Sequence, residues 1–222
     1  MLRSLSLAIE ELFEPRFRRV VLLGVAITVA AFLVLWAAIA VALTRTTIFD
    51  LFWLESLVDL LGGLAALVLS WFLFPAAAIV TIGFFTDGLV QAIERDHYPD
   101  LPPVPDLSWA TQIAIGVKYG ALSLVLTFLT LPFYLLAGVG HLLALGINGV
   151  LIGRSLFELI ALRRLGAREM RALRARKSLF VFLAGLLIAF LASIPLVNFA
   201  APALGAAFML HLVEGWRRSL AD

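Results

Sequence analysis

The chain has no cysteine and little charge, and both shortages exclude whole classes of protein. Without cysteine it forms neither a disulfide nor a thiolate metal site, and cysteine usage says nothing about its redox compartment. Charged residues make up only 14% of the 222 residues, whereas 63% are hydrophobic and the mean hydropathy is +1.05. A soluble core of this size cannot bury so much apolar surface. The composition therefore predicts an integral membrane protein.

Catalytic motifs are also lacking. The sequence has no G-x-S-x-G, no H-E-x-x-H and no phosphate-binding P-loop. Its three histidines, His97, His141 and His211, are too scattered for a metal signature, and we interpret the last two as helix-packing residues. We expect no enzymatic activity, no cofactor and no metal.

The first half of the chain contains two long uncharged runs, residues 20–43 and 60–85. Both exceed the roughly 20 residues that a membrane-spanning helix needs, and Pro75 should kink the second. Residues 2–13 have apolar side chains at helical spacing, with Glu10 and Glu11 on the polar side, which predicts a helix lying in the membrane interface. These residues lack the order of a signal peptide, so we expect them to be retained.

Two later uncharged runs, 119–153 and 178–213, are each interrupted near the middle. Pro132 divides the first run, and Pro195, Asn198 and Pro202 divide the second. Residues 178–194 give roughly 25 Å of helix against roughly 30 Å of hydrocarbon, so a half-run is marginal for a full crossing, although 133–153 is long enough. The chain therefore has either six spans, or two spans plus two helical hairpins that enter and leave by the same face.

The distribution of basic residues orients the chain. Eight of the 17 lysines and arginines lie between positions 154 and 177, where the pattern predicts a basic amphipathic helix that binds anionic lipid rather than nucleic acid. Arginines also precede the first span and follow the last apolar run, so both termini should be cytoplasmic. Residues 86–110 predict a short surface helix followed by a stiff, proline-rich connection.

The stretch "EPRFRRVVLLG", residues 14–24, is the sharpest candidate for an anion site. A helix that begins near Pro15 would present free backbone N–H groups and its positive dipole end beside Arg16, Arg18 and Arg19. The same arginines would also serve as a cytoplasmic anchor that contacts lipid head groups. Both interpretations remain open at this stage.

Other polar residues allow two interpretations each. Asn198, with Asn148 on the preceding hairpin, predicts a polar constriction inside an assembly, or else an ordinary turn outside a six-span fold. Glu94 and Arg95 either pair within the protein or guard an entrance. Glycines favour close helix packing or oligomerisation; they are Gly62, Gly63, Gly138, Gly140, Gly146, Gly149 and Gly153.

Three stretches resemble one family of membrane proteins: "NGVLIGRSLFELIALRRLGAREMRALR" at 148–174, "IPLVNFAAPALGAAFMLHLV" at 194–213 and "FFTDGLVQAIE" at 84–94. Together with the basic segment before the first span, they resemble the CysZ sulfate permease family, more broadly the etoposide-induced-protein-like membrane family. The resemblance covers essentially the whole chain. The chain has "PRF" where the family has a glycine-containing approach to its arginines.

The resemblance implies an all-α protein of the bacterial inner membrane, with two transmembrane helices, two re-entrant hairpins and interfacial helices. Its single membrane domain would comprise residues 1–15 (amphipathic helix), 16–85 (two transmembrane helices), 86–110 (cytoplasmic connection), 111–153 (first hairpin), 154–177 (basic segment) and 178–216 (second hairpin).

In function, the resemblance implies a homo-oligomeric, ATP-independent path that supplies sulfate, or a related oxyanion such as sulfite, for cysteine biosynthesis. The sulfate-binding residues are expected at Arg16, Phe17, Arg18 and Arg19, of which Arg18 and Arg19 match the family best. The resemblance implies Glu94, Arg95 and Asn198 for the pore and its entrance, and the position of Asn148 on the preceding hairpin adds it to this set. From the residues alone, the competing hypothesis is a structural protein whose hairpins shape the bilayer.

Overall fold

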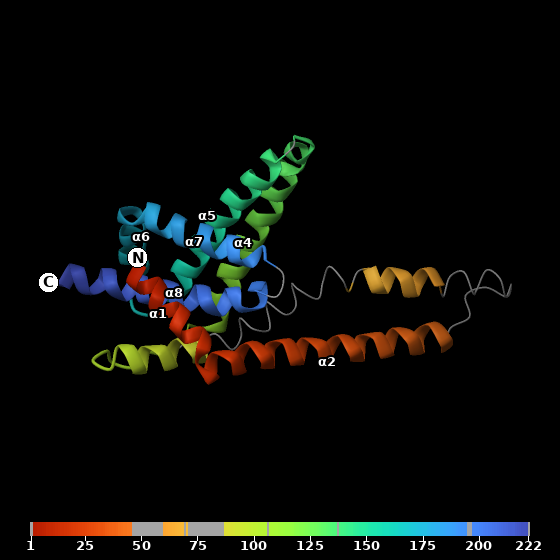
Figure 1. The fold of residues 1–222 in the computed structure, drawn as a ribbon, viewed down its shortest axis with the longest axis horizontal. Coiled ribbons are helices and arrows are strands. Elements are labelled where there is room, and N and C mark those ends of the chain that lie inside the picture. The colour runs from red at the N-terminus through yellow and green to blue at the C-terminus, as the bar shows by residue number, and fades with distance from the viewer. Residues whose placement is uncertain are drawn as a thin grey trace.

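The computed structural model describes residues 2–45, 60–68, 70, 87–105, 107–136, 138–194 and 197–221. These residues form helices joined by short connections, with no strand among them, which confirms the all-α prediction. Figure 1 shows the long helix α2 along one side of the molecule and the α4–α5 hairpin projecting away in a different direction. Helix α8 passes between them.

The expected N-terminal helix is present as α1, Leu2–Phe13. Leu2 and Phe13 are exposed, which suits a helix lying against lipid, while Leu5 and Leu12 pack against the protein core. Glu11 differs from the prediction: it does not face solvent with Glu10 but is buried against α8, with only 3% of its surface exposed.

The first predicted span corresponds to α2, Pro15–Arg45, whose apolar part runs to Val41. Only 11% of the most apolar stretch of α2 is buried inside the protein, so most of the surface of this helix is available to lipid or to another subunit. Of the second predicted span, residues 60–68 and 70 are helical, and residues 69 and 71–85, with the expected kink at Pro75, lie outside the described residues. The indole of Trp36 on α2 donates a 2.8 Å hydrogen bond to the hydroxyl of Ser70.

The connection between the spans and the first hairpin contains the predicted short helix, residues 87–97, followed by a turn at 99–100 and a segment without regular structure through residue 105. One face of this helix is not at the surface. Leu89, Val90 and Ile93 are buried and join the cluster formed by α8. The helix therefore belongs to the core.

The first hairpin consists of α4, Trp109–Thr130, a short turn of 3-10 helix, η1, Leu131–Leu135, and α5, Val139–Ala161. Gly138, with φ of 78°, precedes α5 in the left-handed conformation that glycine adopts without strain. Helix α4 begins close to the start predicted for the hairpin at residue 111, although the uncharged run begins only after Lys118. That ammonium is paired with Glu158 of α5, so the helix continues through it.

The basic segment 154–177 was expected to be one helix, and this prediction is wrong. It consists of the end of α5, a turn and the short helix α6, Ala167–Arg176. At Lys177 the chain bends by 84° into α7, Ser178–Ala192. Helix α8, Val197–Ala221, is the next helix, and Pro195, where a break is predicted, lies outside the described residues. Pro202 does not break the chain a second time, since it lies early in α8 and the helix runs through it.

Four described helices are long and apolar enough to cross a membrane: 15–41, 109–130, 139–161 and 197–219. The pair α6 and α7 would add a fifth only as one bent span. Helix α7 has 15 residues, or about 22 Å at about 1.5 Å per residue, which is short of a bilayer core. Helix length thus does not choose between six spans and re-entrant hairpins.

Glycines bring the two hairpins into backbone contact. A Cβ atom on Gly185 of α7 would lie 2.0 Å from the carbonyl oxygen of Gly149 and 2.4 Å from the nitrogen of Gly153, both on α5. A Cβ on Gly153 would lie 2.3 Å from the carbonyl oxygen of Val181. The predicted close approach is therefore confirmed at Gly149 and Gly153, and at Gly153 a side chain would overlap the backbone of α7.

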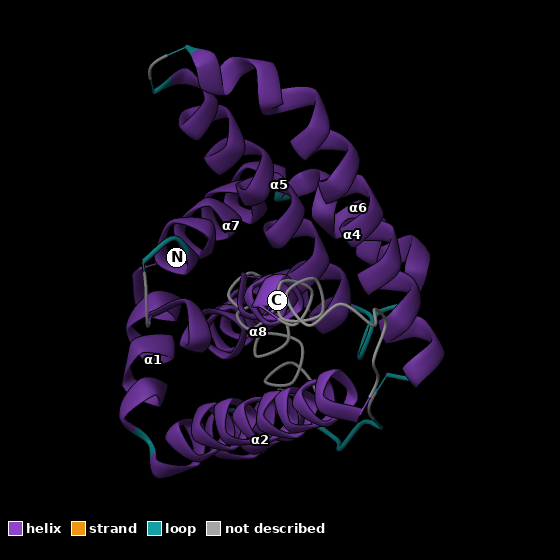
Figure 2. Cartoon of the chain, turned by 90° about the vertical axis from the view of Figure 1, so that its right-hand side faces the viewer, coloured by secondary structure: helices purple, strands orange, loops and turns teal. Residues whose placement is uncertain are grey.

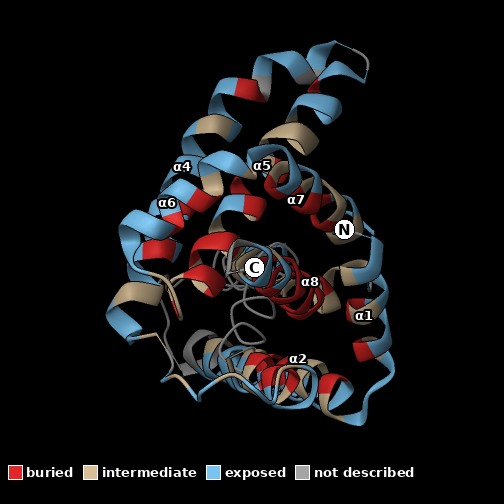
Figure 3. Ribbon diagram, turned by 90° about the vertical axis from the view of Figure 1, so that its left-hand side faces the viewer, coloured by how far each residue is buried: buried red, intermediate tan, exposed pale blue. Residues whose placement is uncertain are grey.

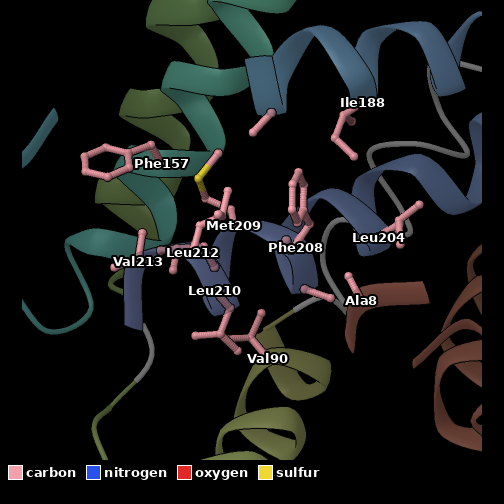
Figure 4. Close-up of a cluster of buried hydrophobic side chains, with 14 of the residues drawn as sticks. Ala8, Val90, Phe157, Ile188, Leu204, Phe208, Met209, Leu210, Leu212 and Val213 are labelled. Atoms are coloured by element: carbon pink, nitrogen blue, oxygen red, sulfur yellow. The ribbon is translucent and has the colours of Figure 1, made fainter. Parts of the chain in front are cut away.

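Helix α8 forms the centre of the protein. It packs against α1, α2, α5 and α7, and Figure 2 shows it nearly end-on among them. The most apolar stretch of α8 is 72% buried inside the protein, whereas that of α2 is 11% buried. Helix α8 is therefore surrounded by protein instead of lipid (Figure 3). Figure 4 shows Phe208 and Met209 of α8 packed among residues of other helices, including Phe157 and Ile188.

Candidate functional site

The start of α2 carries the predicted sulfate-binding residues. Pro15 occupies the first helical position, where its missing N–H costs nothing. The carbonyl of Glu14 accepts hydrogen bonds from the backbone N–H groups of Phe17, at 3.1 Å, and Arg18, at 3.3 Å. Two of the amides expected to hold an anion are therefore already satisfied, and any anion held here relies on the arginine side chains.

The four predicted residues point to different surroundings. Arg16 is paired with Asp96 at the end of the helix 87–97, and Phe17 is buried in the core with 2% of its surface exposed. Arg18 and Arg19 are both exposed, and neither has an ion-pair partner among the described residues. Of the predicted set, Arg18 and Arg19 are thus the cations without a neutralising carboxylate.

The structure assigns Glu94 and Arg95 opposite environments. Glu94 is buried and bonded, since Arg164 Nε donates to its Oε1 at 3.1 Å and Arg163 lies 3.6 Å from its other oxygen. Arg95 is exposed. Both residues line a pocket of about 430 Å³ between the helix 87–97 and the chain that follows it. The prediction that Glu94 pairs within the protein is confirmed, and the entrance role stays a prediction.

Glu94 belongs to a larger charge network that the sequence did not reveal. Arg164 also lies 3.6 Å from Glu214 of α8 and donates a 2.9 Å hydrogen bond to the carbonyl of Pro102. The network contains Asp87, Glu94, Glu214, Arg163, Arg164 and Arg217, equal numbers of acids and bases. Because its central members are buried, each charge requires its partner. The network ties the connection, the turn after α5 and α8 together.

A second unforeseen junction forms where α4, α5 and α6 meet. Glu158 of α5 is buried and accepts hydrogen bonds from Lys118, at 3.0 Å, and from the hydroxyl of Tyr119, at 2.7 Å, both on α4. Arg174 of α6 pairs with the same carboxylate. One carboxylate therefore fixes the base of the first hairpin.

Beside this junction lies a pocket of about 330 Å³ with a positive lining. Arg154 of α5 and Arg171 and Arg174 of α6 line it, together with Ser178 at the first position of α7. A helix N-terminus and guanidinium groups are the donors that proteins use for oxyanions. The geometry suits a phosphate-like or sulfate-like group, free or on a lipid.

The two predicted pore asparagines are not joined by any hydrogen bond within the described chain. Asn148 is exposed on α5. Asn198 lies in the first turn of α8, and its side-chain Oδ1 is buried without a hydrogen-bond partner. Pro202 has no N–H to offer the backbone carbonyl of Asn198 four residues earlier. The start of α8 is therefore a polar spot with unmet acceptors, while the pairing with Asn148 stays a prediction.

The histidines are arranged differently from the sequence expectation of scattered packing residues. The rings of His97 and His211 lie edge to face with centroids 5.1 Å apart, and Glu11 lies beside His97. Burial raises the pKa of the Glu11 carboxyl, an effect that His97 and Arg16 partly offset. Burial also raises the pKa of the neighbouring Tyr98, which keeps its phenol protonated.

Comparison with known proteins identifies one family. The family model described as sulfate transporter CysZ/etoposide-induced protein 2.4 matches residues 4–202 of the chain. That range includes the start of α2 and all of the charge network except Glu214 and Arg217. No curated protein matches the chain.

Proposed function

Since the chain belongs to the sulfate transporter CysZ/etoposide-induced protein 2.4 family, we propose that it is a sulfate permease that provides a channel-like path without ATP hydrolysis. The family is one of transporters and the chain a multi-pass membrane protein, which agrees with the absence of enzyme motifs. In this proposal the protein resides in the bacterial inner membrane with both termini in the cytoplasm. It delivers sulfate, with sulfite as a related substrate, for cysteine synthesis.

The observation that carries this proposal is the pair of exposed arginines at the start of α2. Sulfate is a strongly hydrated dianion, so its path must replace lost water with positive charge and donors, yet release the ion again. Arg18 and Arg19 provide charge that no carboxylate in the described chain neutralises. By contrast, Arg163 and Arg164 are committed to buried acids.

The tip of the first hairpin supports the re-entrant arrangement within this proposal. Residues 131–138 carry no charge, and Phe133, Leu135 and Leu136 are exposed at the turn, Leu135 by 89%. The side chains of such a tip suit the membrane interior, whereas a tip that emerged into water would be expected to be polar. Backbone groups at such a depth require protein or water around them, which is why we include neighbouring subunits.

The positions of the termini support the proposed orientation. Helix α1 packs against α8, and Figure 1 shows both chain ends on the same side of the molecule. The basic helix α6 lies at that side too. Because lysines and arginines concentrate on cytoplasmic surfaces, this is the cytoplasmic side in our proposal.

The decisive experiment is a sulfate-flux assay on two double variants in liposomes. We expect Arg18→Ala/Arg19→Ala to lower sulfate binding and the uptake of radiolabelled sulfate, while the protein still inserts. The matched control, Arg168→Ala/Arg176→Ala, removes the same charge from exposed positions on α6 and should leave uptake near the wild-type rate. Equal uptake by the wild type and the Arg18/Arg19 variant would refute the assigned role.

The second candidate, a structural protein that organises the bilayer, is favoured by one feature. Helix α1 turns Leu2, Ile9 and Phe13 outward, as a helix embedded in the interface would. A chain with this role would move neither sulfate nor sulfite in the same liposomes.

If the protein is a permease, competition between sulfate and sulfite in the flux assay would establish which of the two it prefers.

A further inference from the structure

Three side chains far apart in the sequence converge on the side of α8 that faces α1. Glu11 comes from α1, His97 from the last turn of the helix 87–97, and His211 from α8. One oxygen or ring nitrogen from each lies within 4.8 Å of the other two. His97 Nδ1 lies 3.4 Å from Glu11 Oε1.

Two atoms of this group are buried and unsatisfied. Glu11 Oε2 and His211 Nε2 have no hydrogen-bond partner, and their residues are only 3% and 2% exposed. Burying a polar atom without a partner is unfavourable, and the great majority of buried polar atoms in folded proteins have one. A carboxylate oxygen and an imidazole nitrogen with free lone pairs are what a cation would satisfy.

The other nitrogen of His211 is already positioned. Its Nδ1 lies 2.9 Å from the hydroxyl oxygen of Tyr98. When Nδ1–H donates to that oxygen, the Nε2 lone pair is left free to bind a metal. Histidines that bind a metal through one ring nitrogen usually donate a hydrogen bond from the other. The His97 side chain is 31% exposed, which gives a cation a route from solvent.

We propose that Glu11, His97 and His211 bind a divalent cation of the zinc type. Two imidazoles and one carboxylate match the ligand preference of zinc and its first-row neighbours, whereas calcium and magnesium require more oxygen ligands. Tetrahedral ligands at zinc lie about 3.3 Å apart, so the separations of up to 4.8 Å close by at most about 1.5 Å on binding. Water completes the coordination.

The ion would cross-link three parts of the chain. It would hold the interfacial helix α1 and the cytoplasmic connection against α8, next to the pair formed by Arg16 and Asp96. Its role is therefore structural: it fixes the approach to α2 without touching the arginines assigned to sulfate. The inference does not depend on the proposed transport activity.

The test uses the full-length chain in detergent, without a histidine tag and stripped of metal. We expect isothermal titration to show one Zn²⁺ bound per chain, with a raised melting temperature, and no binding of Ca²⁺ or Mg²⁺. Co²⁺ should give the strong visible absorption of a tetrahedral site. Glu11→Gln, His97→Gln and His211→Gln should each weaken Zn²⁺ binding at least tenfold.

His141→Gln is the matched control, since it removes the remaining histidine from a different helix and should leave the affinity unchanged. His97 lies partly at the surface, so His97→Gln keeps the test valid even where His211→Gln fails to fold. Tyr98→Phe should weaken binding by roughly tenfold, as a lost second hydrogen bond does. The absence of Zn²⁺ binding, or the same affinity in His97→Gln as in His141→Gln, would overturn the proposal.

Discussion

Arg164 and Glu94, which are 70 positions apart in the sequence, form a buried ion pair with 3.1 Å between Nε and Oε1. The same guanidinium lies 3.6 Å from Glu214, so one arginine neutralises acids from two separate segments. A charge in such a position cannot be removed without leaving its partners unpaired in an environment that excludes water. Arg164 therefore joins the helix 87–97 to α8 and is a structural centre of the fold.

Replacing Arg164 with alanine should destabilise the protein strongly. We expect the free energy of unfolding to fall by about 3–5 kcal/mol, because Glu94 and Glu214 would be left buried with too little positive charge. Thermal unfolding in detergent would measure the effect. Arg168→Ala, at an exposed position four residues further on, should change the free energy of unfolding by less than about 0.5 kcal/mol. A similar small change in both variants would argue against a stabilising network.

Gly185→Ala should separate the two hairpins. The added Cβ would lie 2.0 Å from the carbonyl oxygen of Gly149, and since that atom belongs to the backbone, helices α5 and α7 must move apart. We expect a loss of about 1–3 kcal/mol in the free energy of unfolding, measured by thermal denaturation.

The control for this substitution is Gly146→Ala. Gly146 lies on α5, and a Cβ atom added there would have no atom within 4 Å. The control should be neutral, or stabilising by up to about 1 kcal/mol, because alanine favours helix more than glycine does. If Gly185→Ala proved as stable as Gly146→Ala, the close packing of α5 on α7 would be wrong.

Local features of the sequence predicted the helices well. The period of residues 2–13, the uncharged run at 20–43 and the proline that starts α2 each correspond to an observed helix or helix boundary. Local rules failed where a distant partner changed their meaning. Lys118 ended a predicted apolar run, yet the helix continues, because Glu158 of another helix neutralises the ammonium.

The candidate sites show the same division. The exposure of Arg18 and Arg19 was predictable from a basic cluster at the start of a span. The clustering of Glu11, His97 and His211 was not, since their spacing matches no short motif and the fold alone brings them together. For Glu158, one sequence signal existed: basic residues greatly outnumber acids around it. This excess indicates that several basic side chains pair with the same carboxylate.

Removing the partner of Arg16 should strengthen anion binding. Asp96 neutralises Arg16, so Asp96→Asn would add an unpaired cation beside Arg18 and Arg19. We expect sulfate to bind about threefold more tightly, since an exposed ion pair is worth up to about 1 kcal/mol. Sulfate titration monitored by calorimetry is the measurement. Asp100→Asn makes the same charge change at an exposed position nearby and should have a smaller effect.

The accessibility of Asn198 to water distinguishes a permease with a water-filled path from a structural protein that organises the bilayer. Its side-chain oxygen is buried without a partner within one chain, and Pro202 leaves its carbonyl without the usual donor. In a permease these acceptors would meet water at a constriction between subunits, so Asn198→Cys in this cysteine-free chain should react with a water-soluble thiol reagent. Ala203→Cys, one or two turns further along α8 at a position that is 0% exposed, should not react. Sulfate should slow the reaction at position 198 if the ion passes there. An unreactive thiol at 198 would favour the structural protein, and a thiol that reacts only from the periplasmic side, unaffected by sulfate, would indicate an ordinary external turn.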